Sequence, residues 1–149
     1  LVNAARETVS SFERQGFIYP GEIKTVIEAG VEVDVARVIR AEVELYDFSW
    51  KQKSNFPSVR VSYREIKTEA KDDKVSVTGL LVNDNSFGIS RAVAGAIIED
   101  EFGLPVGASE TVLEFIPPFG TAPFEISVPG DGLSGVSAQD IKVVVEAKR

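Results

Sequence analysis

Three residue types are missing from this chain of 149 residues, which contains no cysteine, no histidine and no methionine. Without cysteine there are no disulfides, no thiol nucleophile and no cysteine ligand for zinc. Without histidine there is no Ser-His-Asp triad and no side chain that ordinarily acts as a general base near neutral pH. The commonest catalytic arrangements are therefore excluded, and we expect a protein that is not an enzyme and carries no cofactor.

Long apolar runs and a basic surface are missing as well. No segment approaches the ~20 apolar residues that a membrane-crossing helix requires, so we expect no membrane span in this chain. The chain has 16 basic and 23 acidic residues, a net charge of −7. Such a surface repels phosphate backbones, and a nucleic-acid partner is not expected. Because the sequence begins with Leu1, we expect a piece of a longer protein with any signal or anchor outside it.

Hydrophobic residues make up 44% of the chain, enough for a packed core, and within residues 58–149 they follow strand patterns. Alternation over 59–70, a polar turn at 71–74 and alternation over 75–82 predict a hairpin. Residues 92–98 are apolar at both alternating positions, which favours a central strand over a short helix. Further strands are predicted at 104–115, 124–128 and 141–145. This spacing of short strands and Gly/Pro turns predicts an antiparallel β-sandwich of the immunoglobulin-like type.

The first 57 residues show a less regular pattern. Residues 31–35 and 42–45 alternate valine or leucine with acidic residues, which predicts two more strands. Residues 46–58 are rich in polar residues and contain Pro57, as in a connection between two parts. We therefore predict two parts, residues 1–57 and residues 58–149.

An internal repeat would explain the first part. Residues 1–9 and 104–112 share five identities in nine positions at an offset of 103, and later landmarks follow in the same order. The identities are Leu1, Ala5, Glu7, Thr8 and Val9 with Leu104, Ala108, Glu110, Thr111 and Val112. The competing explanation is that any two β-rich segments share such patterns. If the repeat is real, the first part is the C-terminal half of one sandwich, whose open edges the second part, another copy or another fragment must cover.

Several short motifs of the second part carry a family resemblance. Residues 75–79 lead to Val82-Asn83, residues 96–100 lead to Phe102-Gly103, and a Pro/Gly loop from Pro118 leads to a strand opened by Phe124. In this order they resemble the FxLYD-type domain, a small immunoglobulin-like sandwich of extracytoplasmic prokaryotic proteins. Where that family has Leu-Tyr-Asp, this chain has residues 98–100, Ile-Glu-Asp. The sequence also resembles a plant-type desiccation-protein sandwich, which has a similar pattern of strands. Neither family implies catalysis, and the resemblance implies a secreted or cell-envelope setting.

Carboxylates are the only reactive groups in quantity, and they gather at predicted turns. The stretches are Asp72-Asp73, residues 83–85, residues 99–101 and Asp131. Oxygen-rich loops at one end of a sandwich are able to bind Ca²⁺, whereas Asp and Asn are also ordinary turn formers. A carboxylate pair that hydrolyses glycosides would require an aromatic-lined cleft.

Aromatic residues are the candidate binding groups, because tyrosine and tryptophan are enriched at interaction hot spots. The candidates are Tyr46, Phe48, Trp50 and Phe56 near the junction, and Phe119 in a proline-rich loop. Two structural roles compete: the first four would pack between the two parts, and Phe119 would plug one end of the sandwich.

The sequence thus predicts a non-enzymatic β-sandwich spacer or protein-interaction module of a secreted or cell-envelope protein, with a protein partner or self-association. The alternative is a ligand-binding module that holds carbohydrate or Ca²⁺ with its end loops.

Overall fold

The computed structural model of the chain describes residues 1–16, 18, 23–28, 31, 34–50, 52, 58–71, 73–130 and 141–148. The chain divides into two compact units, Leu1–Pro57 and Ser58–Arg149. None of the helices among the described residues has the length and apolar character needed to cross a membrane.

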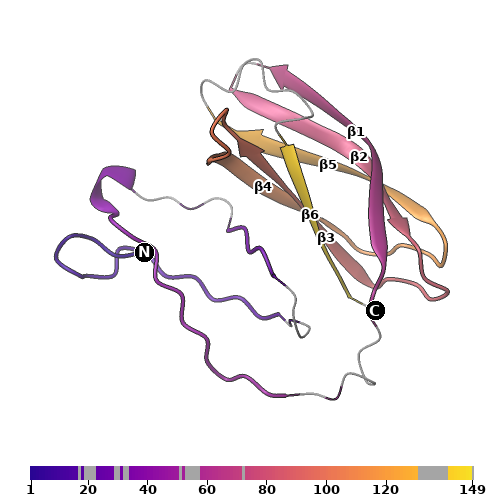
Figure 1. The fold of residues 1–149 in the computed structure, drawn as a ribbon, viewed down its shortest axis with the longest axis horizontal. Helices are drawn as coiled ribbons and strands as arrows, with labels where there is room; N and C mark the ends of the chain where they lie inside the picture. The colour runs from indigo at the N-terminus through magenta and orange to yellow at the C-terminus, as the bar shows by residue number, and fades with distance from the viewer. Residues whose placement is uncertain are drawn as a thin grey trace. The chain divides into compact units, whose positions relative to one another are not determined.

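Among the described residues of the second unit, six antiparallel strands form two three-stranded sheets (Figure 1). One sheet has the order β1-β2-β5 and the other the order β4-β3-β6. The strands are β1 (Val61–Lys71), β2 (Lys74–Asn83), β3 (Arg91–Glu99), β4 (Pro105–Leu113), β5 (Thr121–Pro129) and β6 (Ile141–Lys148). The predicted all-β fold with two sheets is confirmed, and so is each strand predicted in this part of the sequence.

Two tight turns account for the β1–β2 and β3–β4 pairings in this strand order. The hairpin of β1 and β2 closes where Lys71 pairs with Lys74. At the β3–β4 turn, Asp100 accepts hydrogen bonds from the backbone N–H groups of Phe102 and Leu104, and Gly103 has a positive φ of 76°. A glycine adopts that conformation without steric cost, which explains the tight reversal. β3 then pairs with β4 on one side and β6 on the other, as expected of a central strand.

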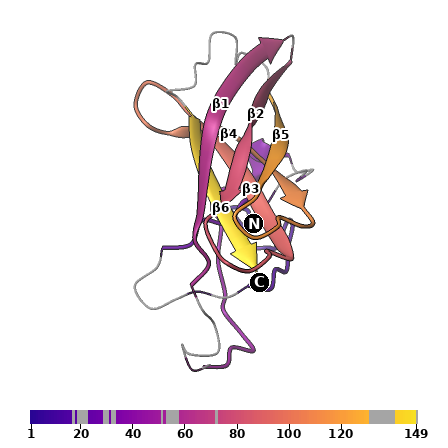
Figure 2. The ribbon, with the colours of Figure 1, turned by 90° about the vertical axis from the view of Figure 1, so that its right-hand side faces the viewer.

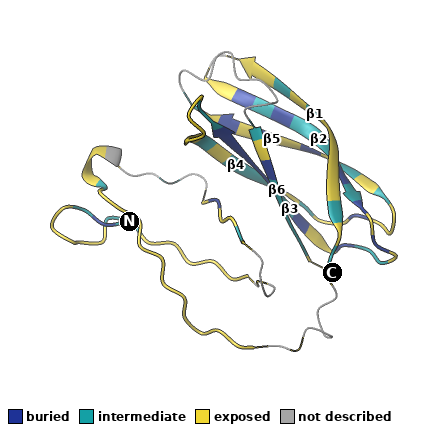
Figure 3. Ribbon diagram, in the orientation of Figure 1, coloured by how far each residue is buried: buried dark blue, intermediate teal, exposed yellow. Residues whose placement is uncertain are grey.

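The core of the second unit lies between the two sheets (Figure 3). Alternate residues of β2, β3 and β5 face it and are buried, as the period of two in a strand requires. These core residues are Val75, Val77, Leu81, Ala92, Ala94, Ala96, Ile98, Phe124, Ile126 and Val128. Ile89 and Ile116, in two loops at one end, belong to the same core and have no solvent exposure. The sandwich therefore extends its core into the loops at that end.

Of the two strands predicted in the first unit, the one at 42–45 is not formed, and residues 32 and 33 of the other, at 31–35, lie outside the described residues. The described residues at 34–45 contain one short 3₁₀ helix, η1 (Val35–Arg37), and no strand. Val43 and Leu45 are 89% and 84% exposed, and residues 41–50 belong to no β-ladder. Alternation makes a segment compatible with a strand, but a strand also requires a neighbour that pairs with its backbone groups. Among the described residues, residues 41–45 have no such neighbour.

The segments that suggested an internal repeat have different conformations. β4 covers most of 104–112 as an extended strand. Residues 1–9 instead fold back on themselves, since Val2 bridges to Thr8 and the Asn3 side chain accepts hydrogen bonds from the N–H groups of Ala5 and Glu7. Val2 bridges also to Arg40. The first unit therefore does not show half of a second sandwich among its described residues.

Candidate functional site

Two buried asparagines hold one end of the sandwich together. Asn83, at the end of β2, is fully buried, and Asn85 is 4% exposed. The Asn83 amide Nδ2 donates to the carbonyl oxygens of Phe87 (2.8 Å), Ile116 (3.2 Å) and Pro117 (2.8 Å). Its Oδ1 accepts from the backbone N and the Nδ2 of Asn85, at 3.0 and 2.8 Å. One side chain thus joins the β2–β3 loop to the β4–β5 loop.

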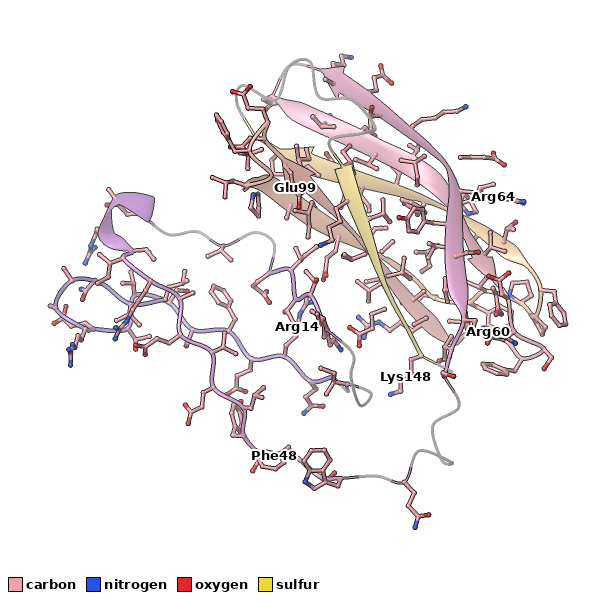
Figure 4. The ribbon with its side chains drawn as sticks, viewed as in Figure 1. Arg14, Phe48, Arg60, Arg64, Glu99 and Lys148 are labelled. Atoms are coloured by element: carbon pink, nitrogen blue, oxygen red, sulfur yellow. The ribbon has the colours of Figure 1, made fainter. Side chains whose placement is uncertain are left out.

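Asn85 continues this network in two directions. Its side chain exchanges two hydrogen bonds with the backbone of Arg60, which precedes β1 (Figure 4). Its own carbonyl accepts a hydrogen bond of 3.1 Å from the N–H of Phe119. No buried side-chain nitrogen or oxygen among the described residues lacks a hydrogen-bond partner. A fully paired buried polar network fixes geometry, because any displacement leaves a buried donor or acceptor unpaired.

The β4–β5 loop that this network holds ends in a tight turn at Pro117–Gly120. The N–H of Gly120 donates to the carbonyl of Pro117 at 3.0 Å, and Phe119 has a φ of 52°. A hydrogen bond across four residues, with proline second and a positive φ third, is the pattern of a type II turn. Glycine or asparagine is usual at the third position, since other residues are strained there. Here the residue at that position is phenylalanine.

Two phenylalanines of this loop are displayed to solvent. Phe119 is 72% exposed and Phe115 is 63% exposed. A Cβ on Gly88 would lie 2.8 Å from an edge carbon of the Phe115 ring, so this ring packs on the Gly88 backbone. Pro117 and Pro118 are exposed between the two phenylalanines. We call residues Phe115–Gly120 the aromatic loop. Phe119 does not plug the end of the sandwich, because Ile89 and Ile116 fill that position.

The aromatic candidates of the first unit are also exposed. Tyr46, Phe48 and Trp50 are 56%, 73% and 91% exposed, and Phe56 lies outside the described residues. The rings of Phe48, labelled in Figure 4, and Trp50 meet edge to face, with centroids 6.3 Å apart. A hydrogen bond to Glu13, with smaller contributions from desolvation and from the charges of Glu13 and Glu44, raises the pKa of Tyr46.

Two of the carboxylates that were candidates for Ca²⁺, Asp84 and Asp100, accept hydrogen bonds from neighbouring groups. Asp100 accepts two backbone hydrogen bonds within its turn, and Asp84 accepts a hydrogen bond of 2.8 Å from the Ser62 hydroxyl. Asp72 and Asp131 lie outside the described residues. Within the described part of the chain, no three acidic side chains gather in a way that would hold a metal ion.

Sequence reasoning identified Phe119 but missed the residues that position it. Asn83 and Asn85 looked like ordinary turn formers, because the sequence does not show that two loops close over them. Phe115 also escaped notice, since it reads as the end of a strand. One available signal was the pair of phenylalanines flanking two prolines in FIPPFG.

The chain matches no family model, no curated protein and no solved structure. A function for this chain can therefore be inferred only from its own residues.

Proposed function

We propose that this protein is a non-enzymatic interaction module that binds a protein partner through the aromatic loop, with Phe119 as the main anchor. The observation that carries this proposal is the backbone strain at an exposed position. Phe119 has a φ of 52° and is 72% exposed, so its side chain contributes little to the core. A left-handed backbone costs a non-glycine residue roughly 1–2 kcal/mol. Strain of this kind is characteristic of residues kept for function.

The loop is also prepared for binding. Pro117 and Pro118 restrict their own φ angles, and the buried asparagines fix both the incoming and the outgoing backbone. A group that is already held in place loses little conformational entropy when a partner closes over it. Aromatic side chains bury a large area at a small entropy cost, which makes them effective anchors. The arrangement therefore favours a partner with an apolar pocket.

The composition of the sequence supports a non-enzymatic role. The chain has no histidine and no cysteine, so the most frequent catalytic side chains are missing. The FxLYD-like motifs add a setting to this proposal, in which the sandwich is part of a secreted or cell-envelope protein and also acts as a spacer.

The test compares three single variants of the full chain as immobilised bait for a cell-envelope extract, with bound proteins quantified by mass spectrometry. Phe119→Gly removes the anchor and relieves the strain, so we expect it to lose the partner while stability is unchanged or higher by about 1 kcal/mol. Phe115→Ser should weaken capture as well. Phe102→Ser is the matched control, because Phe102 is 79% exposed and lies at the other end of β3, about 30 Å away for nine residues.

The outcome supports the proposal when one protein is retained by the wild type and Phe102→Ser and is lost with Phe119→Gly. Equal capture by all variants would refute a role for the aromatic loop. If the wild type binds phospholipid vesicles and Phe119→Gly abolishes that binding, the partner of the aromatic loop is a membrane surface and not a protein.

A further inference from the structure

The edge strands of the sandwich differ in how they are protected. An open edge is a row of unpaired backbone groups that another strand is able to join. β1 is interrupted by a bulge between Arg64 and Lys67, and charged residues occupy much of its length. β5 contains Pro123 and Pro129, which have no N–H to donate. These two edges of the β1-β2-β5 sheet are therefore poor acceptors.

The β4 edge is also obstructed. β4 begins with Pro105, and its register with β3 shifts between Ile98 and Glu99. In addition, β4 of one sheet contacts β5 of the other, which brings the two edge strands together along one long side of the sandwich. A strand that joined β4 would have to approach through that seam.

The edge of β6 has neither a bulge nor a proline, although Lys142, Glu146 and Lys148 are charged. β6 pairs with β3 over all eight of its residues without a register shift, and it contains no proline. Figure 2 shows it at the edge of its sheet, and no described residue pairs with its other side. Residues 143–145 are three consecutive valines, the residue type with a strong preference for strands. Because this edge is regular and rich in β-branched valine, it is the edge of the second unit best suited to pair with an additional strand.

The charges of β6 specify which strand fits it. Val143 is in the core, and Ile141, Val145 and Ala147 pack against it, so Lys142, Val144 and Glu146 share the outer face. Lys142 and Glu146 are equally far from Val144, one on each side. If two copies of β6 pair antiparallel about a two-fold axis at Val144, Lys142 of each copy lies opposite Glu146 of the other. A register centred on Val145 would instead place Lys142 opposite Lys148, which is unfavourable.

We propose that the protein forms a two-fold symmetric dimer through β6, in which two sheets join into one continuous six-stranded sheet. The partner is a second copy of this chain. A two-fold interface requires a self-complementary surface, and the Lys142–Val144–Glu146 triplet is self-complementary in the antiparallel orientation. This interface does not include the aromatic loop, so a result that refutes one of the two proposals leaves the other untouched.

Charge reversal on β6 tests the dimer. Sedimentation equilibrium of the full chain at low ionic strength should show a monomer–dimer equilibrium. Lys142→Glu places two like-charged pairs in the symmetric interface, and we expect the dissociation constant to rise roughly tenfold or more. Lys142 is exposed, so this variant should keep its fold, with circular dichroism as the check. The double variant Lys142→Glu/Glu146→Lys restores both opposite-charge pairs and should return the constant to within about threefold of the wild type.

Two outcomes would overturn the proposal. One is a wild type that remains monomeric at several hundred micromolar, on the order of a millimolar dissociation constant. The other is a dimer whose dissociation constant does not respond to Lys142→Glu. Phe119→Gly should leave the dimer unchanged, and a dimer that it dissolves would assign self-association to the aromatic loop instead.

Discussion

Replacement of Asn83 by alanine should destabilise the sandwich strongly, although Asn83 lies next to a loop. Its side chain is fully buried and makes three contacts through Nδ2 and two through Oδ1. The amide has two hydrogens for three carbonyls, so one hydrogen is shared and four hydrogen bonds are counted. At about 1 kcal/mol each, their loss lowers the free energy of unfolding by about 4 kcal/mol. That is a large part of the 5–15 kcal/mol typical of a domain.

The assay is urea denaturation of the full chain followed by far-ultraviolet circular dichroism, because the strands of the described structure all belong to the second unit. Asp84→Ala is the matched control, since Asp84 is the exposed neighbour of Asn83 with a single side-chain hydrogen bond. We expect that control to change the free energy of unfolding by no more than about 1 kcal/mol. If Asn83→Ala is as mild as Asp84→Ala, the buried network does not hold the two loops, and the argument for a prepared aromatic loop loses its basis.

Two further predictions concern a core contact and a titration. Gly79→Ala should lower the free energy of unfolding by about 1–3 kcal/mol, because the added Cβ would lie 2.6 Å from Ile66 Cδ1 and 2.8 Å from Phe124 Cζ; an unchanged urea midpoint would contradict this. Tyr46 should ionise at a higher pH than an unperturbed tyrosine, because its hydrogen bond to Glu13 favours the neutral phenol. The difference in ultraviolet titration between the wild type and Tyr46→Phe measures this, and Glu13→Gln should move the midpoint down; a midpoint that stays in place would count against the hydrogen bond.

The strands of the second unit could be predicted from the sequence because local pattern and tertiary environment agree there. Residues 75–82 alternate in the sequence, and β2 has a neighbour on each side that satisfies its backbone. Val43 and Leu45 follow the same local pattern, and there the prediction was wrong. A strand is a property of two segments, and the pattern of one segment does not reveal whether the other exists.

The candidate site was only partly predictable for a related reason. Phe119 attracted attention by its type and its proline-rich surroundings, but its exposure depends on Ile89 and Ile116 filling the end of the core. Asn83 and Asn85 are buried because residues far apart in the sequence, at positions 60, 87, 116, 117 and 119, converge on them. Such convergence is a result of the fold, and nothing in the local sequence of the loop indicates it.

The two prolines of β5 limit the size of any assembly that the sandwich is able to build. Each copy has one unobstructed edge, at β6, and a two-fold dimer uses both copies' edges at once. No unobstructed strand edge remains among the described residues of the pair for a third copy to join. As the protein concentration rises, we therefore expect the dimer to become the main species and no larger assembly to form. A sandwich with open edges on both sides would instead grow into filaments. Pro123 and Pro129 thus prevent a further copy from adding a strand at β5.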